Sequence, residues 1–146
     1  MKRRALFFIG IALGISLLLL MFAHEGQSGI KYEKVFSSRQ DDFILHIRVE
    51  EMNKGIRILR SLQYVGKDTV EIKHQTPLIS VSLQNRNHDY TGSTVKKTLK
   101  TGNIYYQEPV IIDVPIEKES ELYVQAKFSV DDEWIYMNHV ETLIFN

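Results

Sequence analysis

The ten residues ELYVQAKFSV, Glu121 to Val130, carry the pattern that decides the fold. Apolar side chains stand at every second position and polar or amphipathic ones stand between them. Successive side chains of an extended strand point to opposite faces, so this stretch predicts a β-strand with one buried face. The apolar row is Leu122, Val124, Ala126, Phe128 and Val130, and the opposite row is Tyr123, Gln125, Lys127 and Ser129.

Three other stretches repeat this alternation: FILHIRV (43–49), PLISVSLQ (77–84) and PVIIDVPI (109–116). Their apolar rows are Phe43, Leu45, Ile47 and Val49; Ile79, Val81 and Leu83; and Val110, Ile112, Val114 and Ile116. Further candidates are IKYEKVF (30–36), IRILRSLQYV (56–65), TVEIKH (69–74), TVKKTL (94–99) and EWIYMNHVETLIF (133–145). A shift of one residue in strand pairing would expose the apolar row to solvent, so the pairing register of each strand should be well specified.

Turn-forming residues separate these candidates, as in MNKG (52–55), VGKD (65–68), QNRNHDYTGS (84–93) and VDDE (130–133). The pattern predicts about eight or nine strands in a mainly β fold, an antiparallel sandwich of two sheets. A small barrel is the alternative architecture. An α+β domain with a helix within residues 41–65 is a third possibility.

A longer pattern resembles a known class of domains. The stretch LQYVGKDTVEIKHQTPLISVSLQN (62–85), followed by ELYVQAKFSV, resembles immunoglobulin-like domains of small exported or membrane-tethered Gram-positive bacterial proteins. In those domains a strand leads into a Y-x-G turn, and the penultimate strand alternates aromatic and aliphatic residues. The chain departs from antibody domains because it has no paired cysteines and because Trp134 falls near its end. The resemblance implies an immunoglobulin-like fold and an exported location, and it transfers no functional residue.

The region before the strands has a different composition. Residues 5–23 carry no charge, and a helix of that length would span roughly 28 Å, close to the thickness of a bilayer's hydrocarbon core. Lys2, Arg3 and Arg4 precede it, so the positive-inside rule predicts a cytoplasmic amino end and an extracytoplasmic body. The alternative is a signal peptide cleaved after Ser28, with Gly26 and Ser28 as the small residues before the cut.

The predicted organisation follows from these segments. Residues 1–4 form a cytoplasmic basic stub, 5–23 a transmembrane anchor or signal segment, 24–40 a linker with a possible first strand, and 41–146 the β-sandwich. Three of the 18 basic residues precede residue 24, so 15 remain against 18 acidic ones. This balance predicts no basic face and no nucleic-acid partner. The lack of cysteine excludes disulfides, thiolate metal sites, a cysteine nucleophile and a lipid-modified cysteine.

Motifs for catalysis or metal binding are missing from the sequence. It contains no GxSxG, GxGxxG or GxxxxGK[ST] motif, and its five histidines form no HxH, HExxH or HxxxH spacing. His46 and His74 are expected at outward strand positions. The acidic run from Asp131 to Glu133 predicts a charged hairpin turn, with a calcium site as the less favoured reading. The sequence therefore predicts a non-enzymatic protein with no cofactor and no metal.

Two small groups of residues are the candidates for binding. Asn87, His88 and Asp89 form a polar cluster in a predicted loop, where binding residues are common. Tyr105 and Tyr106 are adjacent, so an extended backbone would expose one of them. Trp134 is expected in the core. The predicted function is a membrane-tethered extracytoplasmic interaction module whose partners are the membrane and another envelope protein. The alternative is a secreted inhibitor or ligand-binding sandwich, and a hydrolase is the least favoured reading.

Overall fold

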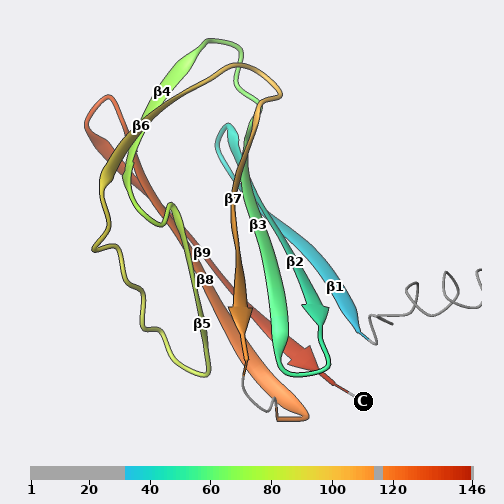
Figure 1. Ribbon diagram of the computed structural model, residues 1–146. Helices are drawn as coiled ribbons and strands as arrows, with labels where there is room; N and C mark the ends of the chain where they lie inside the picture. Colours follow the sequence, from blue (N-terminus) through green and yellow to red (C-terminus); the bar gives the residue numbers. More distant parts are fainter. Residues whose placement is uncertain (1–31, 114–116, 146) are drawn as a thin grey trace, which may run out of the picture. The chain divides into compact units, whose positions relative to one another are not determined.

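The computed structural model describes residues 32–113 and 117–145. The predicted anchor at residues 5–23 and the basic residues before it lie outside the described residues. Within residues 32–113 and 117–145, no helix has the length and apolar character needed to cross a membrane. The described part is mainly β, and its secondary structure consists of nine strands (Figure 1). They are β1 (Glu33–Gln40), β2 (Phe43–Glu51), β3 (Ile56–Tyr64), β4 (Val70–Gln75), β5 (Ile79–Leu83), β6 (Thr94–Leu99), β7 (Ile104–Ile112), β8 (Glu119–Val130) and β9 (Glu133–Ile144).

The strands form two antiparallel sheets. The four-stranded sheet has the order β1-β2-β3-β7, and Figure 1 shows these strands side by side. In the five-stranded sheet, β9 pairs with β8 along the whole length of β8. The other edge of β8 is shared, because β5 pairs with its middle, from Leu122 to Ala126, and β4 pairs with its end. Strand β6 completes this sheet by pairing with β4.

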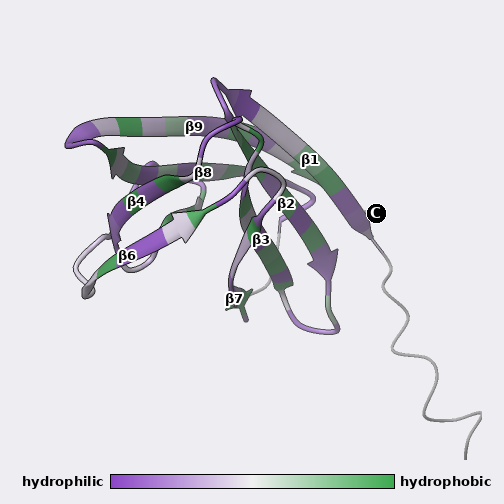
Figure 2. Ribbon diagram, turned by 90° about the horizontal axis from the view of Figure 1, so that it is seen from above, coloured by the Kyte–Doolittle hydropathy of each residue, from purple (hydrophilic) through white to green (hydrophobic). Residues whose placement is uncertain are grey.

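The hydrophobic core lies between the two sheets. Phe43, Leu45, Ile47 and Val49 of β2 are all buried, as are Leu122, Val124, Ala126 and Phe128 of β8. The ring of Phe128 meets the ring of Phe43 edge-on across the core, with 4.8 Å between centroids. Figure 2 shows hydrophobic and hydrophilic residues alternating along β9, as expected for a strand with only one buried face.

The structure confirms the mainly β, antiparallel prediction. The apolar rows predicted for residues 43–49 and 121–130 form the inner faces of β2 and β8. The proposed helix within residues 41–65 is wrong, because this stretch forms the β2–β3 hairpin. The possible first strand is present as β1, which pairs with β2 over its full length, so the sheet begins at Glu33 rather than at residue 41. Asp131 and Asp132 form the predicted turn between the last two strands, both with positive φ.

The expectation that His74 points outward is wrong. His74 lies two residues after the buried Ile72, so both side chains face inward, and only 2% of His74 is exposed. The hydrogen bonds of its ring are satisfied there, since Nδ1 lies 2.8 Å from the Gln75 carbonyl and Nε2 lies 3.2 Å from the Tyr105 hydroxyl. His46 does lie on the outer side of its sheet, where it is hydrogen-bonded to Gln63.

Polar contacts join the edges of the two sheets. On one side, the Lys34 ammonium of β1 donates to the Thr142 carbonyl of β9 at 2.8 Å and forms an ion pair with Glu141. The ring of Phe36 stacks on the ring of His139 beside this contact, with centroids 4.6 Å apart. Unpaired strand edges invite pairing with other chains, and charged side chains that reach across them reduce this tendency.

Candidate recognition face

The outward side of the β8–β9 hairpin is the candidate site. Antiparallel pairing sets Tyr123 opposite Val140, Gln125 opposite Asn138, and Lys127 opposite Tyr136. These six side chains and Trp134, opposite Ser129, are named here the β8–β9 outer face. Their neighbours of opposite parity, among them Phe128 and Met137, are buried in the core. Core packing therefore fixes which side chains this face presents.

Large apolar side chains are exposed along β9. The exposed fractions are 51% for Trp134, 46% for Tyr136 and 44% for Val140. The expectation that Trp134 belongs to the core is wrong. Met137 and Leu143 occupy the inner face of β9, so the odd-numbered positions point inward and Trp134 must point outward. Exposed aromatic rows of this kind are typical of binding surfaces.

Lys127 lies at the centre of an aromatic cluster. Its Nζ is 5.1 Å from the ring centroid of Trp134, 5.4 Å from that of Tyr90 and 5.8 Å from that of Tyr136. Each distance lies within the range of a cation–π interaction. The ammonium thus lies close to three rings, two of which belong to the exposed residues Trp134 and Tyr136.

The segment between β5 and β6 crosses onto this face. The Tyr90 hydroxyl lies 2.8 Å from the Gln125 carbonyl oxygen and 3.0 Å from Gln125 Oε1. Burial raises the pKa of Tyr90, so its hydroxyl remains a hydrogen-bond donor at neutral pH. The segment is also held locally, since Asn85 Oδ1 accepts from Ser82 Oγ at 2.8 Å and from the Asn87 amide at 3.1 Å.

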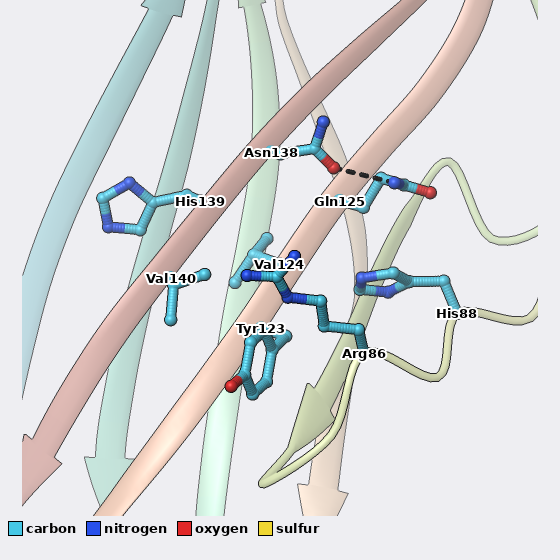
Figure 3. Close-up of a pocket in the computed structure, with 8 residues that line it drawn as sticks. All are labelled: Arg86, His88, Tyr123, Val124, Gln125, Asn138, His139 and Val140. Atoms are coloured by element: carbon cyan, nitrogen blue, oxygen red, sulfur yellow. Dashed lines mark hydrogen bonds between the residues drawn. The ribbon is translucent and has the colours of Figure 1, made fainter.

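A pocket of about 450 Å³ lies between this segment and the hairpin (Figure 3). Its lining residues are Arg86, His88, Tyr123, Val124, Gln125, Asn138, His139 and Val140. Gln125 Nε2 donates to Asn138 Oδ1 at 2.7 Å, which fixes the orientation of both amides in the pocket lining. Figure 3 shows the Arg86 and His88 side chains reaching from the segment toward β8. The volume suits a small ligand group rather than a large substrate.

The charge of the pocket is set by Arg86. Its guanidinium carbon lies 5.6 Å from the centroid of the Tyr123 ring. Within the described residues, neither Arg86 nor Lys127 forms an ion pair with a carboxylate. Burial lowers the pKa of His88, so its imidazole is neutral at pH 7, and its shielded Nδ1 has no hydrogen-bond partner in the described part of the chain. The pocket is therefore cationic and able to form hydrogen bonds.

The structure separates the binding residues predicted from the sequence. His88 lines the pocket, whereas Asn87 and Asp89 are exposed on the same segment. Tyr105 and Tyr106 lie on β7 of the other sheet. One of them is exposed as expected, because 71% of Tyr106 is accessible. Tyr105 is partly buried and contacts His74. The predicted residues thus do not form one site.

Sequence reasoning missed most of the β8–β9 outer face. The alternating pattern places Gln125 and Lys127 only in the polar row of a strand, Asn138 only within a candidate strand, and Arg86 only within a loop. The parity of EWIYMNHV contained a usable signal, because Trp134 and Tyr136 share their row with the polar Asn138. A row that mixes aromatic and amide side chains fits an exposed face better than a core.

A second pocket, of about 400 Å³, is lined by Arg60, Asp89 and residues of β5 and β7. The Arg60 guanidinium donates to the carbonyls of Ile79 and Glu108, so it joins the two sheets. Burial lowers the pKa of Arg60. The donors of Arg60 are thus used by backbone carbonyls and are not free for a ligand. No group of three or more metal-ligating side chains gathers within residues 32–113 and 117–145.

No protein-family model matches the chain, and no curated protein matches it. Among solved structures, the chain is similar to the GAE domain of GGA2p from Saccharomyces cerevisiae, with 15% sequence identity over 77% of this chain and 97% of that chain. The TM-score is 0.42, and a likeness at this level supports no conclusion about function.

Proposed function

We propose that this protein is a non-enzymatic, extracytoplasmic interaction module, tethered to a membrane by residues 5–23 and binding through its β8–β9 outer face. The observation that carries the proposal is the exposed aromatic row of β9, beside a cationic pocket. A single fixed scaffold presents both, which is the usual arrangement in recognition domains.

The proposal includes an immunoglobulin-like topology. Strands β2-β3-β7 follow the order of strands A, B and E in immunoglobulin domains, and β9-β8-β4 follow the order of strands G, F and C. The chain passes from one sheet to the other between β3 and β4 and again between β7 and β8, as it does between B and C and between E and F. This correspondence supports the resemblance noted in the sequence.

The proposed location rests on the uncharged segment at residues 5–23 and the basic residues before it. The test uses the fact that the chain has no cysteine. A single Lys54→Cys substitution places a thiol in the exposed β2–β3 turn. A membrane-impermeant maleimide should label this variant of the full-length protein in intact cells. Labelling only after lysis would refute the location.

The alternative is a secreted ligand-binding sandwich, favoured by the small residues Gly26 and Ser28 at a possible cleavage site. Intact-mass measurement of the protein recovered from cells separates the two forms. A mass that includes residues 1–28 supports the tethered form, and a mass that begins at Gly29 supports the secreted one.

The binding role of the face is tested with a matched pair of valines. Val140 lies on the β8–β9 outer face, and Val35 is an exposed valine of β1 in the other sheet. A photo-crosslinking amino acid is placed at each position of the full-length protein in its native cells. Crosslinked products should form from position 140 and not from position 35. Equal products from both positions, or none from position 140, would refute a specific role for this face.

A further inference from the structure

The pocket on the β8–β9 outer face has the chemistry of an anion-binding site. Arg86 supplies a guanidinium, and none of the eight lining residues carries a carboxylate. Lys127 adds a second positive charge on the same strand as Gln125. Glu121 accepts a hydrogen bond from the hydroxyl of the Tyr123 ring beside Arg86, but within the described residues Arg86 itself forms no ion pair. A guanidinium without an ion pair is suited to a carboxylate ligand, because its planar donors match the two carboxylate oxygens.

The aromatic row beside the pocket suits a ring with an apolar face. Trp134 and Tyr136 expose large parts of their rings, and Lys127 holds both in place. The carbon–hydrogen face of a pyranose stacks on such rings, whereas its hydroxyl groups need donors and acceptors at the rim. The amide of Asn138 and the imidazole of His88 provide polar atoms next to the rings.

The length of the face sets the size of the ligand. Trp134 and Asn138 are four residues apart on one strand, a span of about 14 Å, which corresponds to about three sugar units. A ligand with one charged unit in the pocket would therefore extend two more units along the row toward Trp134.

From these features we infer that the β8–β9 outer face binds a carboxylated oligosaccharide, with one carboxylate at Arg86 and its pyranose rings along Asn138, Tyr136 and Trp134. The inference deepens the proposed binding role of this face and rests on it. It assigns an acidic polysaccharide as the partner, and an acidic protein segment is the competing occupant that the test must exclude.

Trp134 provides the readout, because it is the only tryptophan of the chain and lies on the face itself. The full-length protein in detergent is titrated with trigalacturonate and with a hyaluronate tetrasaccharide, and tryptophan emission is followed. At least one of the two should shift the emission in a saturable way at concentrations up to about 10 mM. The methyl ester of the same saccharide should bind at least about tenfold more weakly, because it has lost the charge that Arg86 recognises.

Matched variants locate the site. Arg86→Gln should lower the affinity at least about tenfold, because it removes a charge-assisted hydrogen bond. Arg39→Gln, an exposed arginine of β1, should leave the affinity unchanged. Calorimetry of Tyr136→Ala should show weaker binding as well, which reports on stacking without using the emission of Trp134.

Several outcomes would overturn the inference. The first two are that neither saccharide binds, or that the methyl ester binds as tightly as the free acid. The other two are that Arg86→Gln and Arg39→Gln lower the affinity equally, or that a triglutamate peptide binds as tightly as the saccharides. The labelling and crosslinking experiments involve no saccharide. If crosslinking at position 140 succeeds and both saccharides fail, the ligand class is wrong while the interaction role stands.

Discussion

Phe128→Ala tests whether the fold depends on the alternating strand β8. Phe128 is fully buried, and its ring meets that of Phe43 across the two sheets. Phenylalanine-to-alanine changes in well-packed cores cost about 3–5 kcal/mol in the free energy of unfolding. A typical domain has about 5–15 kcal/mol in total, so this variant should be close to the limit of folding.

The contribution of the ring pair can be separated from that of burial. Edge-to-face aromatic pairs add about 0.5–1.5 kcal/mol beyond the area they bury. A double-mutant cycle with Phe43→Leu and Phe128→Leu should therefore give a coupling energy of that size, since leucine retains much of the volume. Because leucine fills most of the space, each single variant should lose less stability than Phe128→Ala.

The assay is urea unfolding of the full-length protein in nonionic detergent, followed by circular dichroism in the β-sheet region. Tyr106→Ala is the control, because Tyr106 is 71% exposed and its loss should change stability by no more than about 0.5 kcal/mol. A loss below about 1 kcal/mol for Phe128→Ala would show that the two sheets do not pack through this residue, and the described core would be wrong.

Three further predictions follow from polar contacts. Changing Arg48 and Arg57 together to methionine should lower the free energy of unfolding by about 3–5 kcal/mol, because Glu50 would remain as an unpaired buried charge; it is 4% exposed and lies 3.0 Å from Arg48 Nε. Urea unfolding at pH 7 measures this loss, and an unchanged stability would mean that Glu50 is solvated. Burial raises the pKa of Glu141, but its bonds to a lysine and a histidine outweigh this and hold its pKa below the ordinary 4.5. The stability that Glu141 contributes is thus complete above pH 4.5 and is lost as the pH falls through the lower folded-state pKa. Glu141→Gln should therefore reduce the loss of thermal stability that is measured between neutral and acidic pH. An unchanged loss would contradict the contacts of Glu141 with Lys34 and His139. Tyr90→Phe should cost about 1 kcal/mol by loss of its hydroxyl hydrogen bond, and a stabilised variant in thermal unfolding would show that the bond is not formed.

The sequence by itself determined the strands and their inner faces. Leu122, Val124 and Phe128 alternate with polar residues, and only a half-buried strand places all three in a core. The parity of a strand is a local property, so it needs no knowledge of the partner strands. The outward position expected for His74 conflicts with this rule, because its spacing of two from Ile72 places both side chains on the inner face.

The tertiary structure alone decided which surface residues meet. Arg86 lies over the ring of Tyr123, 37 positions further along the chain, and no local pattern brings the segment after β5 onto the β8–β9 hairpin. Sheet pairing places Gln125 opposite Asn138, and the Tyr90 hydroxyl then anchors the segment above them. Burial of apolar area fixes the face of each strand, whereas long-range strand order fixes which exposed side chains become neighbours. The candidate site depends on the second of these, which explains why the sequence indicated His88 and missed the residues around it.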